Sequence, residues 1–200
     1  MSLEDICHQI QLSPDNDFSK LLRTILNEIQ SPILEVYDLT RVNSFRRMIS
    51  TQENTIKKLK DSNDVGSETL LHCQIYEMEI NRIEYYLTLY TKTRLRKIHE
   101  MVKNGITEHL NKMTRNESEL YKKYQELHKK FFEKSGVENP EFQNTLDDNR
   151  YVFVRILKEI DNFKIHPDDE DAIQMNPGEI YLLPYKSIHD FVNTDSVELI

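Results

Sequence analysis

The chain has no tryptophan and only four glycines among its 200 residues. So few glycines suit a mainly helical protein and leave little material for a glycine-rich loop that cradles a nucleotide. The sequence also lacks a phosphate loop, a GxSxG nucleophile elbow and an HExxH metal pair. We therefore expect a protein that is not an enzyme and that uses no cofactor.

Cysteine is equally scarce, because Cys7 and Cys73 are the only two and lie far apart. Isolated thiols of this kind are typical of a reducing compartment, either the cytosol or the nucleus. The seven histidines are scattered, and none has metal-ligand spacing to a cysteine. The acidic run at 168–171 lacks the alternating oxygen ligands and central glycine of a calcium loop, so a solvated turn explains it better. No metal site is predicted.

Long hydrophobic runs and an excess of positive charge are also missing. The first ten residues carry no basic leader, and no apolar run approaches the roughly 18 residues that cross a bilayer. We expect neither a secretory signal nor a membrane contact. The net charge of -8 argues against a broad basic face for duplex DNA, so DNA contact should be indirect or weak.

One stretch dominates what the sequence does contain. Residues 71–101 run without proline or glycine, and apolar residues recur at helical spacing, which predicts a single long helix. Its first apolar ridge comprises Leu71, Ile75, Met78, Tyr85 and Leu89, and its second ridge comprises Tyr76, Ile80, Ile83, Leu87, Tyr90 and Ile98. A surface helix needs only one apolar stripe of about 100°. We therefore expect this helix to lie between two layers, one formed by the chain's own helices and the other by a different protein.

Further helices are predicted on both sides of this stretch. Asp17 can cap a helix over 17–30, and Ser31-Pro32 should begin another that ends near residue 60. After Asn104-Gly105, an amphipathic helix that begins at Ile106 should pack antiparallel to the long helix, because the connection is short.

The overall prediction is a mainly α protein with an N-terminal helical bundle followed by a small β-rich C-terminal domain. We expect an N-terminal arm at 1–16, an α-helical domain at 17–134, a linker at 135–149 and the β-rich domain at 150–200. Within that last domain, strands are predicted at 151–157 and 197–200, a hairpin with strands at 172–175 and 180–185, and a short helix capped by Ser187. A domain of about 50 residues is marginally stable alone, so it should lean on something larger.

The long helix also carries a family resemblance. Its residues Met78-Glu79, Arg82-Ile83, Tyr85, Leu87, Tyr90, Arg94-Leu95 and Lys97-Ile98 form the motif M-E-x-x-R-I-x-Y-x-L-x-x-Y-x-x-x-R-L-x-K-I. This motif resembles the Sld-five family of subunits of GINS, the four-subunit complex of the eukaryotic replicative helicase. The resemblance resumes at Tyr151-Val152-Phe153 with Arg155, at Pro167-Asp168 and at the terminal 197–200. It implies a helical A domain followed by a β-rich B domain.

The resemblance also implies a function and partners. It predicts a non-catalytic structural subunit that assembles with Psf-one, Psf-two and Psf-three into a heterotetramer. That complex would join the MCM hexamer and Cdc forty-five in the CMG helicase, which initiation and elongation of DNA replication require. The resemblance places the chain in the nucleus.

We expect the second ridge of the long helix to bind a partner subunit, because an obligate contact has a mainly apolar centre. The predicted anchors are Tyr76, Ile80, Ile83, Leu87 and Tyr90. Arg94 should pair with a carboxylate at the rim of that contact. The apolar end formed by Val197, Leu199 and Ile200 should complete the β domain and, as in this family, help join it to a neighbouring subunit.

Two other functions compete with this one. The chain can be a generic helical adaptor with a small β module, which would not co-purify with three proteins of similar size. It can also be a binder of single-stranded DNA, with Tyr85, Tyr86 and Tyr90 beside Arg82 and Arg94. Steep salt dependence of binding would support that function, although tyrosines at helical spacing are more often packing residues.

The N-terminal arm has two interpretations, a frayed tail and a docking peptide. Leu3, Ile6 and Ile10 share one helical face, and acidic residues such as Asp5 lie at its start. This acidic-apolar motif resembles the one by which some fungal Sld-five subunits bind the trimeric replisome hub Ctf-four. The chain departs from it at Glu4 and Cys7, where an aspartate and a leucine are usual.

If the arm is a docking peptide, changing Ile6 and Ile10 to alanine should abolish binding of the hub in a pull-down. Folding should be unchanged in the circular dichroism spectrum, because the arm contributes little to the core. Undiminished capture of the hub by the double variant would rule the docking peptide out.

Overall fold

The computed structural model describes residues 17–61, 66–136, 149–165 and 172–200. The helical part contains α2 (Asp17–Gln30), α3 (Leu39–Lys60), α4 (Ser67–Lys103), the short 3-10 helix η1 (Leu110–Lys112) and α5 (Arg115–Ser135). The C-terminal part contains β1 (Tyr151–Ile156), β2 (Ile160–Phe163), β3 (Ile173–Met175), β4 (Ile180–Pro184), α6 (Tyr185–Asn193) and β5 (Val197–Leu199). This confirms the predicted fold class. The arm at 1–16 and most of the linker at 135–149 lie outside the described residues, and the domain boundaries stay predictions.

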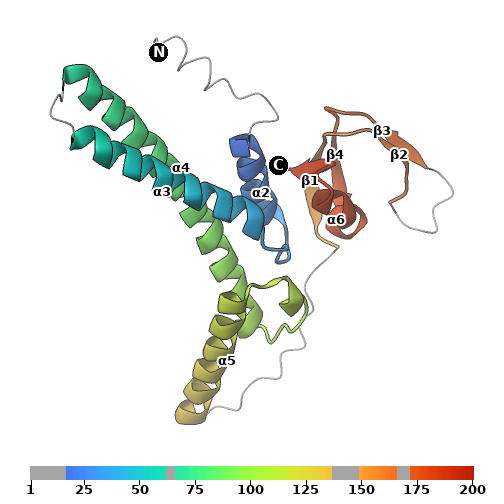
Figure 1. Cartoon of the computed structure of the whole chain (residues 1–200). Helices are drawn as coiled ribbons and strands as arrows, with labels where there is room; N and C mark the ends of the chain where they lie inside the picture. Colours follow the sequence, from blue (N-terminus) through green and yellow to red (C-terminus); the bar gives the residue numbers. More distant parts are fainter. Residues whose placement is uncertain (1–16, 62–65, 137–148, 166–171) are drawn as a thin grey trace.

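The long helix α4 organises the helical part, as its sequence predicts. Its first half lies beside α3 in a two-helix arm, α2 packs near its middle, and α5 leaves its C-terminal end as a separate leg (Figure 1). The core between α2, α3 and α4 consists of Leu21, Ile25, Val42, Phe45, Ile49, Ile56, Cys73, Ile80, Ile83 and Tyr90. The helix ends at Lys103 with Asn104 as its C-cap. The next residue, Gly105, adopts a left-handed φ of 67°, a conformation that favours glycine.

The segment 31–38 is an extended loop, so the expected helix start at Ser31-Pro32 is wrong. Asp38 caps α3 instead, and its side chain accepts a hydrogen bond from the Arg41 backbone N–H. The loop does not continue the helix because it fills two separate cores. Ile33 is buried among β-region residues, whereas Leu34 is buried beside the C-terminal end of α4.

The segment between α4 and α5 also differs from the expected helix at Ile106. His109 has a left-handed φ of 63°, and a capping box between Thr114 and Glu117 starts α5 only at Arg115. This longer connection returns the chain toward the middle of α4. Glu117 therefore lies against Arg94 and Tyr124 against His99, so α5 runs parallel to α4 and not antiparallel.

The C-terminal part holds a three-stranded antiparallel sheet in the order β4-β1-β5 and a two-stranded pair of β2 and β3. The predicted strands at 151–157 and 197–200 correspond to β1 and β5. The expected cap at Ser187 is wrong, because α6 follows β4 directly and begins at Tyr185, which places Ser187 inside the helix. The predicted hairpin is wrong, because β3 pairs with β2 while β4 pairs with β1. The turn at Asn176–Gly178 is closed by the Glu179 carboxylate, which accepts from the Asn176 N–H, and by Gly178, which donates to Ile156. The chain thus changes sheets at this turn.

The β region leans on the helical part of the same chain, beside α2 (Figure 1). Ile33 inserts into its core beside residues such as Val154 and Leu199. The Leu199 N–H donates a 2.9 Å hydrogen bond to the buried Asn27 side chain of α2, which satisfies the outer edge of β5. The Tyr185 hydroxyl donates to the Glu35 carboxylate. One apolar plug and two hydrogen bonds therefore help to fix the β region on the bundle, together with the 3.0 Å contact between Lys112 and His189 of α6 and the 3.7 Å pair of Arg41 and Asp195.

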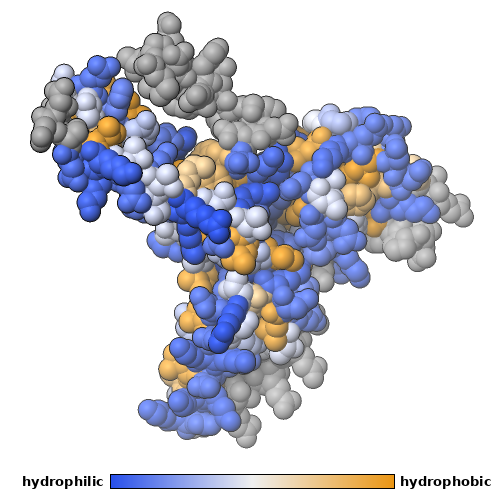
Figure 2. Space-filling view, in the orientation of Figure 1, coloured by the Kyte–Doolittle hydropathy of each residue, from blue (hydrophilic) through white to orange (hydrophobic). Residues whose placement is uncertain are grey.

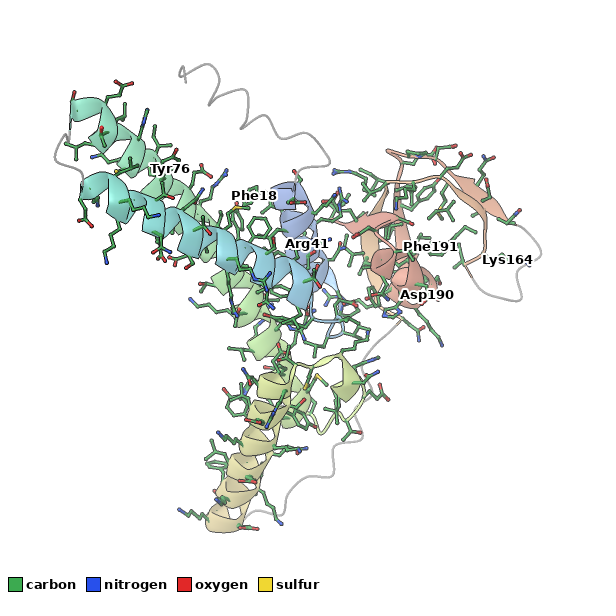
Figure 3. All side chains as sticks on the ribbon, in the orientation of Figure 1. Phe18, Arg41, Tyr76, Lys164, Asp190 and Phe191 are labelled. Atoms are coloured by element: carbon green, nitrogen blue, oxygen red, sulfur yellow. The ribbon has the colours of Figure 1, made fainter. Side chains whose placement is uncertain are left out.

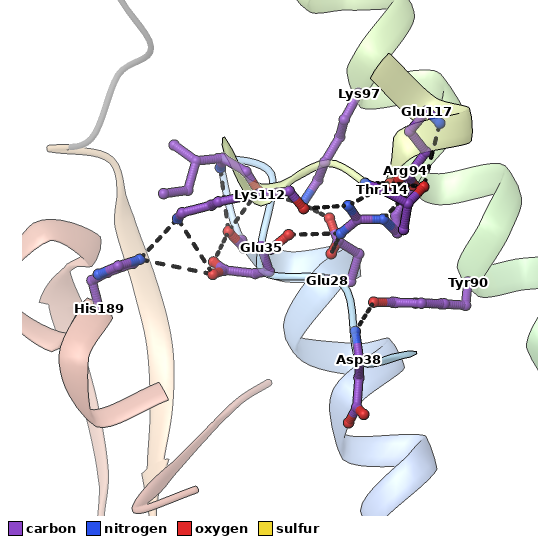
Figure 4. A network of polar contacts seen from close by, with 12 residues as sticks. Glu28, Glu35, Asp38, Tyr90, Arg94, Lys97, Lys112, Thr114, Glu117 and His189 are labelled. Carbon is purple, nitrogen blue, oxygen red and sulfur yellow. Dashed lines mark hydrogen bonds and ion pairs between the residues drawn. The ribbon is translucent and has the colours of Figure 1, made fainter. Parts of the chain in front are cut away.

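A buried polar junction centred on Arg94 joins the helices (Figure 4). This guanidinium has 0% exposed surface; it lies 2.8 Å from the Glu28 carboxylate of α2 and 2.7 Å from the Glu117 carboxylate of α5. It also donates to the backbone carbonyl of Glu35 at 2.7 Å and to that of Lys112 at 3.2 Å. A buried charge is tolerated only when it is paired and hydrogen-bonded, and Arg94 meets both conditions.

The charges of the junction tune one another. Burial pushes the pKa of Arg94 down, but the Glu117 hydrogen bond and the Glu28 charge outweigh it and raise the pKa above its ordinary value. For Glu117, burial opposes ionisation, yet hydrogen bonds from Arg94 and Thr114 hold its pKa below the usual range. Burial lowers the pKa of Lys97, which is only partly offset by its contact with Glu28 at 2.9 Å. Arg94 and Glu117 are therefore both ionised at neutral pH, and each holds the other in its charged form.

Replacing Arg94 with methionine should lower the free energy of unfolding by about 3–5 kcal/mol, because it leaves Glu117 as an unpaired carboxylate and Glu28 with Lys97 as its one remaining cation. Urea titration followed by circular dichroism measures this change. The matched control is Arg115→Met, at a residue that is 91% exposed and pairs with Glu119, where the change should stay within about 1 kcal/mol. Equal losses in the two variants would contradict the structural role of the junction.

Ile33→Ala should destabilise the β region by about 2–5 kcal/mol, because it leaves a cavity in the β-region core. Hydrogen exchange measures the effect as faster exchange of the Val154 and Leu199 amides. Val36→Ala, at an exposed position of the same loop, should leave both rates nearly unchanged. Unaltered protection in Ile33→Ala would show that the β region does not depend on this loop.

Candidate subunit interface

The second ridge of α4 lies inside this chain, contrary to the expectation that it binds a partner. Ile80, Ile83 and Tyr90 are buried in the core with α2 and α3, and Tyr76 and Leu87 are partly buried against it. The Tyr90 hydroxyl accepts a hydrogen bond from the backbone N–H of Asp38 at the start of α3. These side chains serve the chain's own fold because α2 and α3 pack on this side of α4.

Arg94 is also placed differently from the expected rim position. Both of its carboxylate partners, Glu28 and Glu117, belong to this chain. Local sequence held no signal for this, because an arginine near a helix C-terminus is equally well explained by the helix dipole. Only the return of α5 to the level of Arg94 closes the site.

The first ridge of α4 is the exposed one, and we call it the α4 ridge: Leu71, Ile75, Met78, Tyr85 and Leu89. Met78 is 70% and Tyr85 64% exposed, Leu71 is exposed as well, and the other two are partly buried. In Figure 3, the labelled Tyr76 of the second ridge lies on the two-helix arm, and the labelled Phe18 lies on α2, which crosses it. Large apolar side chains that recur along one face of a helix indicate a surface that another protein covers.

The border of the α4 ridge is polar and nearly neutral. Gln74, Asn81 and Thr88 follow one side at helical spacing. Arg82 lies four residues after Met78 and three before Tyr85, so it interrupts the ridge itself. It pairs with Glu79 at 2.5 Å, and its guanidinium lies over a ring of α2. An apolar centre inside a polar border is the usual composition of a subunit interface.

The β region offers a second exposed apolar surface. Val197 and Leu199 are fully buried and complete its core, as expected, and among the predicted terminal residues only Ile200 reaches the surface. Ile200 donates to the backbone carbonyl of Phe153, and Phe153 faces Leu182 across β1 and β4. With their neighbours they form an exposed set, the sheet face: Tyr151, Phe153, Ile180, Leu182 and Ile200. The space-filling view shows apolar patches over this region, the two-helix arm and α5 among hydrophilic side chains (Figure 2).

Sequence reasoning missed most of the sheet face, although one signal was readable. In Tyr151–Ile156, exposed and buried residues alternate, so Tyr151 and Phe153 share the side opposite Val152 and Val154. An aromatic pair on the solvent side of a half-buried strand indicates a covered face.

The tyrosines do not form a platform for bases. The rings of Tyr85 and Tyr86 meet edge to face with their centroids 5.4 Å apart, and the ring of Tyr86 packs edge to face on that of Phe18. Tyr90 and Arg94 are buried, so neither is available to stack on a base. Three consecutive stacking surfaces are therefore not presented on this face.

The pocket where α2, the loop 31–38 and α6 meet does not resemble a reaction site. Its volume is about 350 Å³, and its lining includes Glu28, Tyr37, Arg41 and Asp195. Glu28 is held by Arg94, and Arg41 pairs with Asp38 and Asp195. Burial raises the pKa of Tyr37 above its ordinary value, which keeps its hydroxyl protonated. The lining therefore pairs its own charges and offers no nucleophile beside a free base.

In the described parts of the chain, no group of three metal-ligating side chains comes together. Among the helices of those same parts, none is both long and apolar enough for a bilayer crossing.

Comparisons with known proteins follow the same division of the chain. A family model described as the GINS complex protein helical bundle domain, Sld5, matches residues 46–136. A second, described as the DNA replication complex GINS protein SLD5 C-terminus, matches residues 147–200.

Full-length relatives agree with the family models. The DNA replication complex GINS protein SLD5 of Debaryomyces hansenii is 24% identical, and the alignment covers 93% of this chain and 87% of the relative. The proteins of the same name from Rattus norvegicus and Homo sapiens are each 22% identical, with 96% of this chain and 92% of each relative covered.

The helical bundle, the small β region behind it and these matches together define a GINS protein. Within that class, both family models and all three relatives are of one kind. The chain belongs to the SLD5 family.

Proposed function

We propose that this chain is a non-catalytic structural subunit of a GINS complex that acts in DNA replication. The names of its relatives support membership of that complex. The observation that carries the proposal is the α4 ridge, where Met78 and Tyr85 remain 70% and 64% exposed on a helix whose second ridge packs against α2 and α3. A surface of this kind is expected on a protein that completes its packing with other subunits.

In this proposal the partners are the Psf-one, Psf-two and Psf-three subunits, and the assembly is a heterotetramer. It joins the MCM hexamer and Cdc forty-five in the CMG helicase of the nucleus and serves both initiation and elongation. The chain contributes packing surface and no chemistry. Its contact with DNA is indirect or weak, in keeping with the net charge of -8.

The proposed interface uses other residues than the sequence suggested. The α4 ridge takes the place of Ile80, Ile83 and Tyr90, which are committed to the core. Each large apolar side chain of the ridge contributes about 1.5–3 kcal/mol when it is fully buried. A stable contact buries about 800 Å² on each partner, and the sheet face adds a second exposed apolar surface to the α4 ridge. We therefore propose that the sheet face, with Ile200, forms a second contact with a neighbouring subunit.

Co-expression with the three Psf subunits tests the proposal. The unmodified chain should be purified together with all three, whereas Met78→Lys combined with Tyr85→Lys should lose them, because two charges then occupy the apolar centre. Circular dichroism should show that the double variant is folded, since both side chains are exposed.

The matched control is Met48→Lys, which places a lysine at an exposed apolar position on α3. This variant should keep its partners. An unmodified chain that recovers none of the three subunits would refute the GINS assignment, and full recovery by the double variant would refute the role of the α4 ridge. A generic adaptor would recover none of the three.

A further inference from the structure

The distal half of α5 is an apolar helix face that the described residues leave uncovered. The first half is anchored: Glu117 pairs with Arg94, Tyr121 is buried and donates to the Ile106 carbonyl at 2.9 Å, and Tyr124 packs on His99. Beyond Tyr124 the helix continues to Ser135 and leaves the body as a leg (Figure 1).

The apolar side chains of this leg form one stripe. Leu120, Tyr124, Leu127 and Phe131 follow one another at spacings of four, three and four residues, so they share one side of the helix. Leu127 and Phe131 are 64% and 62% exposed, whereas Tyr121 of the same helix is buried. Helical segments shorter than about 12–15 residues are marginal in water and gain most of their stability by packing an apolar face. Within the part of the chain that the structure describes, no element packs on the exposed stripe of this segment to stabilise it.

Charge is distributed unevenly around the stripe. Lys123, Lys130 and Lys134 follow its edge at spacings of seven and four residues, and within the described part of the chain none of them has an ion pair. On the opposite side of the helix, Lys129 pairs with Glu133 at 4.0 Å. Among the described residues, the stripe is thus bordered along one side by three exposed lysines that form no ion pair, while Glu126 and Glu133 lie further round the helix.

We propose that the distal half of α5 is a docking surface for an amphipathic helix of another protein, with an apolar stripe bordered by aspartate or glutamate. Leu127 and Phe131 would pack into that stripe, as two helices do when their ridges and grooves interdigitate. The lysine edge would meet the acidic edge and fix the orientation and register of the partner, as charges beside an apolar seam do in coiled coils.

Other occupants fit these observations less well. A second copy of α5 would place its lysine edge either against the first lysine edge, where like charges repel, or against an uncharged edge, where the lysines find no partner. Both arrangements cost affinity. A nucleic acid would use the lysines but would leave Leu127 and Phe131 without an apolar partner. An anionic membrane would be repelled by the rest of the chain, whose net charge is -8. This surface is separate from the α4 ridge, and the inference does not rest on the proposed GINS assembly.

The test measures binding of the purified full chain to a labelled synthetic helix of about 20 residues with a leucine stripe bordered by glutamates. A second synthetic helix has lysines in place of the glutamates. Fluorescence anisotropy should give a dissociation constant at least about tenfold lower for the glutamate helix, because several charge pairs across one edge together reach that difference.

The decisive variant reverses the lysine edge by K123E, K130E and K134E and should invert the preference between the two synthetic helices. Its matched control, K122E with K129E, reverses two lysines on the other side of the same turns and should leave the preference as it was. L127S with F131S should weaken binding of the glutamate helix about tenfold or more. Circular dichroism should report unchanged helix content, because all these side chains are exposed.

Equal binding of the two synthetic helices would overturn the proposal, and so would an equal response to the edge variant and its control. Phosphatidylserine vesicles and a single-stranded oligonucleotide form two further arms. If either one binds and the edge variant abolishes that binding while the glutamate helix does not bind, the surface belongs to a membrane or a nucleic acid and the proposal fails.

Discussion

The burial of one guanidinium constrains the rest of the structure. Arg94 is fully enclosed and must keep every donor satisfied, because an unpaired charge in the interior costs several kcal/mol. Its partners come from α2, from the loop 31–38, from the connection after α4 and from the start of α5. Four segments far apart in the sequence are therefore fixed to one side chain, and their geometry cannot change independently.

The consequences extend to the β region through the loop 31–38. The carbonyl of Glu35 accepts from Arg94, and Lys97 holds the carbonyl of Ile33 at 2.6 Å. With both carbonyls fixed, the Ile33 side chain is directed into the β core, and the Glu35 carboxylate meets Tyr185. The position of the β region beside α2 is therefore set by the same junction that holds the helices.

The sequence predicted where the helices and strands lie far better than which of their faces are buried. The uninterrupted stretch at 71–101, the β-branched and aromatic run at 151–157 and the family resemblance gave the fold class, because those signals are local. Both ridges of α4 are apolar, so which of them is buried depends on where α2 and α3 pack, and no local pattern records that. The loop 31–38 resembles a helix start, but its conformation is set by a core that forms more than a hundred residues later in the chain. The late start of α5 was readable, since T-R-N-E at 114–117 is a capping box.

Because the β region is held on the helical bundle, exposed surfaces on the two parts keep a fixed position relative to each other. The α4 ridge lies on the helical part and the sheet face on the β region, and a stable contact buries about 800 Å² on each partner. If the two parts moved freely, a partner that touched both would have to restrict that motion, and the entropy cost would consume part of the gain. Asn27, Ile33 and Glu35 already hold the β region against the bundle, so that cost is met during folding. Two modest surfaces can then act as one preorganised interface.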